Sequence, residues 1–97
     1  MEQTYHVYIL ASDRNGTLYT GVTANLAQRL WQHRGGTGSK FAAKYKVHRL
    51  VHAEAFGDVH AAIAREKAIK KWRRAWKLAL IEGNNPQWID LYDRLNG

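Results

Sequence analysis

The chain has 97 residues, 45% of them hydrophobic, which suffices for one small core and argues against disorder. It contains no cysteine, which excludes disulfides and thiolate metal sites and suits a reducing, cytoplasmic compartment. Fifteen lysines and arginines against eight acidic residues give a net charge of +7, which is typical of proteins that bind polyanions. The sequence shows neither a membrane-spanning apolar run nor a signal peptide.

Two strands are predicted at the start of the chain. Tyr5–Ala11 is an apolar run rich in aromatic and β-branched residues, and Thr17–Val22 is a second. Asn15-Gly16 between them is typical of a tight turn, so the strands should form an antiparallel hairpin. Tyr8 and Tyr19 each lie on one face of their strand, and ordinary packing is the simplest role for either.

A helix is predicted next, capped by Thr23 and ending near Arg34. Its expected apolar stripe consists of Leu26, Ala27, Leu30 and Trp31. Arg29 and His33 are four residues apart and therefore share a face, which by itself would be an ordinary solvated face. The glycine-rich segment 35–39 ends the helix, and residues 40–45 are left open between a loop and a helical turn.

The second half predicts a third strand and three helices. Residues 47–56 alternate as a strand, with Val51, Ala53 and Ala55 on one face. Asp58 caps a helix that reaches about residue 72, and further helix continues to about residue 81. Asn85 is expected to cap a last helix over about 86–95, with Pro86 at its first position.

The element order is therefore β-β-α-β-α-α-α. It predicts an α+β fold in which helices flank a three-stranded antiparallel sheet. We expect residues 1–97 to form one domain, with a core over about 5–82 and the helix over about 86–95 docked on it.

Glu66 lies on the apolar side of the first helix after Asp58, where a carboxylate is usually paired or functional. An ion pair with Lys70, one helical turn later, is the structural alternative. This helix and its continuation carry seven of the fifteen cations, which we interpret as a surface that follows phosphates: Arg65, Lys67, Lys70, Lys71, Arg73, Arg74 and Lys77. Lys40 extends this surface, whereas Trp72 and Trp76 are expected to dock inward.

Several short motifs occur together in the order and spacing of a known family. They are His6-Val7-Tyr8, Tyr19-Thr20-Gly21, Asn25–Leu30, Ala64–Lys67 and Asn85-Pro86-Gln87-Trp88. The chain resembles the GIY-YIG nuclease domain over nearly its whole length, and its small single-domain bacterial branch most. His6 and Thr20 replace the usual glycine and isoleucine of the two signatures, and Val22-Thr23 stands where some members have a lysine.

The resemblance implies a GIY-YIG-like fold and a metal-dependent endonuclease that hydrolyses DNA. Glu66 would bind one Mg²⁺ or Mn²⁺, Arg29 would hold the scissile phosphate, and Tyr8 or Tyr19 would position or deprotonate the water. His33 would assist by lowering a tyrosine pKa or by accepting a proton through Tyr8, the tyrosine favoured as the base. Gly21, in the second signature, is placed beside the nucleic acid.

The physiological substrate stays open: structured or single-stranded DNA is favoured, and RNA is not excluded. A partner protein or a second copy of the chain would supply specificity or a second active site. The main alternative is a non-catalytic nucleic-acid-binding module that keeps the fold, and a third is an interaction domain of a larger complex. All five polar positions of the nuclease site are present, which favours the enzyme.

Overall fold

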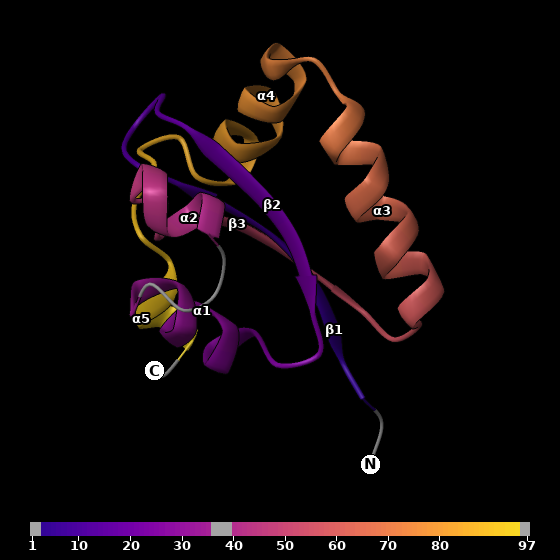
Figure 1. Cartoon of the computed structure of the whole chain (residues 1–97). Coiled ribbons are helices and arrows are strands. Elements are labelled where there is room, and N and C mark those ends of the chain that lie inside the picture. Colours follow the sequence, from indigo (N-terminus) through magenta and orange to yellow (C-terminus); the bar gives the residue numbers. More distant parts are fainter. Residues whose placement is uncertain (1–2, 36–39, 96–97) are drawn as a thin grey trace.

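The computed structural model describes residues 3–35 and 40–95, so the predicted glycine-rich loop at 36–39 lies outside the described residues. The elements are β1 (Tyr5–Ala11), β2 (Leu18–Thr23), α1 (Leu26–Arg34), α2 (Lys40–Tyr45), β3 (Arg49–Phe56), α3 (Val59–Lys71), α4 (Arg74–Asn84) and α5 (Tyr92–Leu95) (Figure 1). The α+β class and the antiparallel sheet flanked by helices are confirmed. The short helix α2 adds one element to the predicted order.

The sheet has the order β2-β1-β3, with both pairs antiparallel and β1 in the centre. Asn15, in the turn before β2, has a φ of 57°, as its Asn-Gly pair predicts. The register pairs Tyr8 with Gly21 and Leu10 with Tyr19. Tyr8 and Tyr19 therefore project from the same face of the sheet on neighbouring strands.

Helices cover both faces of the sheet (Figure 1). On one face Ala62 and Ile69 of α3 and Ile81 of α4 pack against Val7 and Ile9. On the other face α1 and α2 cover the residues that point the opposite way: Tyr8, Leu10 and Leu50, which pack with Leu26, Leu30 and Ala42. The helix that carries Arg29 and His33 thus lies over the two tyrosines.

Two local predictions about β3 and α1 were wrong. Asn25, not Thr23, caps α1: its side chain accepts a hydrogen bond from the backbone of Gln28 at 3.2 Å. A bulge shifts the pairing of β3 with β1, so that Val51 packs in one core and Ala53 against the other. Strand alternation predicted one shared face for these two residues, and a bulge breaks that alternation.

The predicted helix over about 86–95 begins later, at Tyr92. Trp88 is fully buried with a φ of 56°, a left-handed conformation that an α-helix cannot include. The buried Asn85 side chain donates to the backbone carbonyls of Val51 and Ile89 and so ties this segment to β3 instead. None of the helices in the described ranges is long and apolar enough to span a bilayer.

Candidate functional site

Tyr8 and His33 form a buried hydrogen-bonded pair. The Tyr8 hydroxyl and His33 Nε2 are 3.0 Å apart, and both residues are at most 4% exposed. His33 follows Leu26 by seven residues and Leu30 by three, which places it on the inner stripe of α1. The predicted stripe included Trp31 instead, yet Trp31 is 68% exposed.

Tyr19 and Arg29 complete the cluster. The Tyr19 ring meets the edge of His33 with 5.1 Å between ring centroids, and it lies 6.2 Å from the Tyr8 ring. The Arg29 guanidinium interacts with both phenols, and its hydrogen bond to Tyr8 contributes most to raising the Arg29 pKa. Four of the five predicted catalytic residues therefore come together on one face of the sheet.

Burial sets the protonation states of this cluster. It raises the pKa of Tyr8 to about 12, although the charge and hydrogen bond of Arg29 act in the opposite direction. Burial, together with the nearby charge of Arg29, lowers the pKa of His33 to about 4. At neutral pH the imidazole is therefore neutral and the phenol protonated, so the Tyr8 hydroxyl donates and His33 Nε2 accepts.

This arrangement predicts an acid-sensitive fold. An unfolded histidine takes up a proton near pH 6.5, whereas His33 in the folded chain does so near pH 4. The free energy of unfolding should therefore fall as pH drops from 6.5 to 4, by up to about 3 kcal/mol from His33 alone. Urea unfolding of His33→Gln across this range should show a shallower slope than wild type, and parallel curves would contradict the assignment. His6, whose pKa is also lowered by burial, accounts for part of the remaining slope.

Gly21 makes room for Tyr8. A Cβ at Gly21 would lie 2.5 Å from the Tyr8 hydroxyl oxygen and 2.6 Å from Cζ. Contacts this short require the ring to move, because Tyr8 is buried and paired with His33. The structure thus assigns Gly21 a steric role, and its predicted contact with nucleic acid stays a prediction.

Gly21→Ala is expected to lower the free energy of unfolding by about 1–3 kcal/mol, since the added methyl group overpacks a buried site. It should also change the NMR chemical shifts of the Tyr8 and His33 rings, since the ring must leave its position. Gly57→Ala is the matched control, because nothing lies within 4 Å of a Cβ at Gly57. Equal stability of the two variants, with an unchanged Tyr8 ring, would refute this role.

Glu66, the fifth predicted catalytic residue, comes from α3 on the other face of the sheet. Its carboxylate lies 3.2 Å from Lys70 Nζ, and its side chain is 13% exposed. Lys70 lines a hollow of about 310 Å³ together with Tyr19 and Thr20 of the edge strand β2. In the described part of the chain no hydrogen bond or ion pair joins Glu66 to the tyrosine cluster. The hollow at this edge is lined both by Tyr19 of the cluster and by Lys70, the ion-pair partner of Glu66.

Glu66 offers a divalent ion a single carboxylate, which lies beside the ammonium group of Lys70. Among residues 3–35 and 40–95, no group of three or more histidines, aspartates or glutamates could form a protein cage for a metal. Mg²⁺ commonly takes one or two carboxylates and completes its shell with water and substrate phosphate. With Lys70 displaced, the carboxylate of Glu66 would suit an ion bound in this way.

The basic residues of α3 and α4 differ in their surroundings. Arg65 makes a bidentate ion pair with Glu54, at 2.9 and 3.0 Å, and also stacks on Trp72. Arg74 donates to two carbonyls in the β1–β2 turn. Within the described ranges Lys67 and Lys71 are exposed and form no ion pair or hydrogen bond.

These contacts hold Arg65 and Arg74 to the fold, so their role in nucleic-acid binding stays a prediction. The other basic residues assigned to that surface carry the same prediction: Lys40, Lys67, Lys70, Lys71, Arg73 and Lys77. Trp72 docks inward as expected, whereas Trp76 is 53% exposed.

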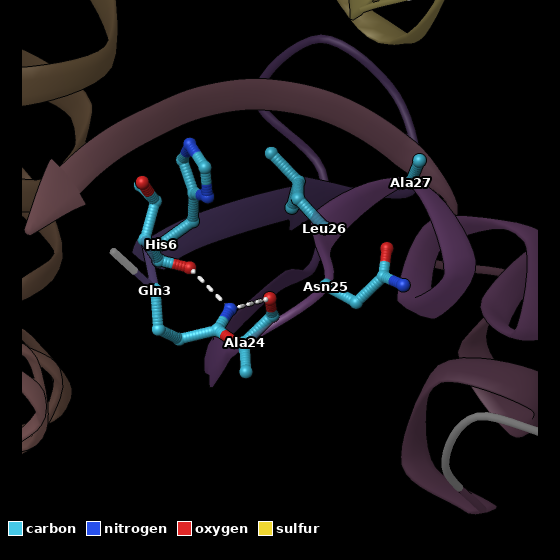
Figure 2. A pocket seen from close by; sticks show the side chains of 7 residues that line it. Gln3, His6, Ala24, Asn25, Leu26 and Ala27 are labelled. Carbon is cyan, nitrogen blue, oxygen red and sulfur yellow. Dashed lines mark hydrogen bonds between the residues drawn. The ribbon is translucent and has the colours of Figure 1, made fainter. Parts of the chain in front are cut away.

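A second hollow of about 320 Å³ opens where β1 begins, beside the start of α1. Figure 2 shows the His6 ring and the Leu26 side chain on its wall, with Gln3 bonded to the Ala24 carbonyl. Among the described residues its lining carries no lysine, arginine or carboxylate, and neither tyrosine of the cluster. It therefore lacks the groups that the chemistry of phosphate requires.

The sequence did not point to Phe41 and Tyr45, yet their rings extend the aromatic contacts of Tyr19. The Phe41 ring lies 6.1 Å from Tyr19 and 4.8 Å from Tyr45, so the aromatic rings continue from the site to the surface of α2. A signal for them was present in the sequence, because the two aromatic residues are four positions apart and each follows a lysine, Lys40 and Lys44.

Comparisons with known proteins bear on the family and the fold of the chain. The family model described as the GIY-YIG catalytic domain matches residues 4–79. A UPF0213 protein of Syntrophus aciditrophicus is 43% identical over 81 residues, covering 81% of this chain and 91% of that protein. One of Natronomonas pharaonis is 40% identical, with 84% and 94% covered. The solution NMR structure of a UPF0213 protein of Bacillus halodurans has a TM-score of 0.57 and 29% identity, covering 90% of this chain and 92% of that one.

Proposed function

The chain belongs to the GIY-YIG catalytic domain family, and from this premise we propose that it is a metal-dependent endonuclease that hydrolyses phosphodiester bonds in DNA. The family implies a nuclease that acts on nucleic acid. The observation that carries the proposal is the buried hydrogen bond between Tyr8 and His33, placed beside the Arg29 guanidinium. Such a pair supplies a proton acceptor next to a phosphate ligand, as hydrolysis of a phosphodiester requires.

Tyr8 and His33 together serve as the base. With a pKa near 12, the phenol alone is a poor base at neutral pH. Tyr8 takes a proton from the attacking water while its own proton passes to His33 Nε2, so a free phenolate does not have to accumulate. Because the pKa of His33 is about 4, the imidazole holds this proton only transiently and releases it to solvent. The water oxygen then bonds to phosphorus, the bond to the leaving sugar oxygen breaks, and that oxygen is protonated from solvent.

The other residues bind and orient the phosphate. Arg29 holds the scissile group through its planar guanidinium, which matches the oxygens of a phosphate. Tyr19, whose ring contacts His33, positions the water or the phosphate beside Tyr8. Glu66 would hold one Mg²⁺ or Mn²⁺, which supplies neutralisation of the charge that develops on the phosphoryl and leaving oxygens.

One observation favours the alternative of a non-catalytic binding module. The ion pair between Glu66 and Lys70 would account for the carboxylate at this position without a metal. On that reading the fold and the basic helices would bind nucleic acid, and the polar cluster would have no chemistry to perform.

The test is cleavage of an end-labelled panel of single-stranded, duplex, flap and branched DNA, and of RNA, with Mg²⁺, Mn²⁺ or EDTA. Metal-dependent cutting of at least one DNA is expected, and the form of DNA that is cut identifies the substrate class. Salt-sensitive binding without cutting of any member would support the binding module. It would also be the result if a partner protein is required. Adding a cell lysate separates these two cases when Glu66→Gln in the same lysate serves as the control for other nucleases.

A further inference from the structure

The hollow beside Tyr19 has the chemistry of a nucleotide site. It measures about 310 Å³ and is lined by Leu18, Tyr19, Thr20, Phe41, Lys70 and Lys77. One wall is aromatic and the other carries two ammonium groups. A nucleotide presents a matching pair of surfaces, because it joins a flat base to an anionic phosphate.

The aromatic wall is held in place before any ligand enters. The Phe41 ring lies between Tyr19, at 6.1 Å, and Tyr45, at 4.8 Å, and it remains 43% exposed. Tyr45 beside it is 45% exposed, so the two rings together leave an aromatic patch of α2 open to solvent. Because its neighbours already restrict the orientation of the Phe41 ring, a base that stacks on it pays little additional ordering entropy.

The cationic wall comes from α3 and α4, which cover the face of the sheet opposite to the tyrosine cluster. Lys70 and Lys77 lie in adjacent turns of α3 and α4, and Lys77 Nζ is 3.4 Å from the Lys70 carbonyl oxygen. Lys70 also contacts Glu66, so the hollow lies between the candidate metal ligand and the tyrosine cluster. Tyr19 lines the hollow and also interacts with Arg29, so a phosphate bound there would lie near the one that Arg29 is proposed to hold.

We propose that this hollow binds one unpaired nucleotide next to the scissile phosphate, with its base stacked on Phe41 and its phosphate on Lys70 and Lys77. The inference rests on the proposed function and narrows it to substrates with at least one unpaired nucleotide. A base within a duplex is stacked on both sides, so Phe41 reaches a base only where pairing and stacking are interrupted.

The test measures binding in EDTA, where no cleavage occurs. Fluorescence anisotropy compares oligothymidylate with an abasic oligonucleotide of the same length and charge. Wild type should bind oligothymidylate about tenfold more tightly, since stacking one base on an aromatic ring has an effect of this order. Phe41→Leu, which keeps an apolar side chain, should bind both about equally, and Phe41→Tyr should restore the preference. Trp31→Leu removes an exposed aromatic outside the hollow and should keep the wild-type ratio.

A wild-type preference that Phe41→Leu leaves intact would overturn the proposal, as would equal binding of both oligonucleotides by wild type. These results are independent of the cleavage panel. If the panel shows metal-dependent cutting while Phe41→Leu behaves as wild type, the nucleotide site fails and the nuclease stands. If the Phe41-dependent preference holds and no DNA is cut, whether by the chain alone or in the lysate, the nuclease fails and the binding site stands.

Discussion

Glu66→Gln is expected to lower the rate of DNA cleavage at least about 1,000-fold while leaving DNA affinity in EDTA within about twofold of wild type. Glutamine keeps the size of the side chain but removes the charge that would hold the ion. Loss of metal-assisted charge stabilisation costs several kcal/mol of the barrier, and each 1.4 kcal/mol is a factor of ten. Single-turnover cleavage and fluorescence anisotropy measure the two quantities.

The controls for Glu66→Gln address its structural alternative. Asp93→Asn removes the exposed carboxylate in the first turn of α5 and should leave cleavage unchanged. Lys70→Met breaks the same ion pair but keeps the Glu66 carboxylate, so metal-dependent cleavage should persist in Lys70→Met at reduced DNA affinity. If Lys70→Met loses cleavage as completely as Glu66→Gln and both variants unfold more easily, the ion pair is structural and Glu66 is not the metal ligand.

Tyr8→Phe is expected to lower single-turnover cleavage by about 10²- to 10⁴-fold, the range typical of general acid–base catalysis. The variant keeps the ring that packs against Leu10 and Leu30 and loses only the hydroxyl that bonds to His33. Loss of that buried hydrogen bond should cost about 1–2 kcal/mol of stability. Tyr5→Phe, on the same strand, is the control and should cleave as wild type does.

A double-mutant cycle separates the relay from two independent contributions. If Tyr8 passes its proton to His33, the Tyr8→Phe/His33→Gln double variant should be about as slow as Tyr8→Phe alone. If the loss of cleavage rate in the double variant equals the product of the losses in the two single variants, the relay is contradicted. If Tyr19→Phe instead carries the large loss and Tyr8→Phe cleaves normally, Tyr19 is the base.

The fold was largely predictable because its signals are local. Asn15-Gly16 indicated the hairpin turn, and the Asp58 cap indicated the start of α3. The features that were predicted wrongly depend on tertiary structure. The bulge at Val51 and the left-handed Trp88 are stabilised by packing and by the Asn85 side chain, which contacts residues distant in the sequence. A pattern of alternation or periodicity contains no information about such contacts.

The candidate site was predictable in its residues and not in its geometry. Motif resemblance identified Tyr8, Tyr19 and Arg29, and the four-residue spacing from Arg29 pointed to His33. Their convergence follows from the register of β1 with β2 and from the docking of α1. The solvated face expected for His33 proved to be the buried stripe of α1, although the Leu26 spacing was available to indicate it. Phe41 was overlooked, since its meaning depends on a hollow formed by four separate elements.

The central claim is that Glu66 and the tyrosine cluster act on one phosphate across the edge of β2. The most direct measurement is paramagnetic broadening of NMR signals by Mn²⁺ in Tyr8→Phe bound to DNA, a complex expected to be cleaved too slowly to interfere. We expect broadening of the NMR signals of Glu66 that extends to Tyr19 and Arg29. This broadening should disappear when the Glu66→Gln substitution is introduced into the Tyr8→Phe variant. Broadening at other carboxylates, unchanged by Glu66→Gln, would contradict the central claim.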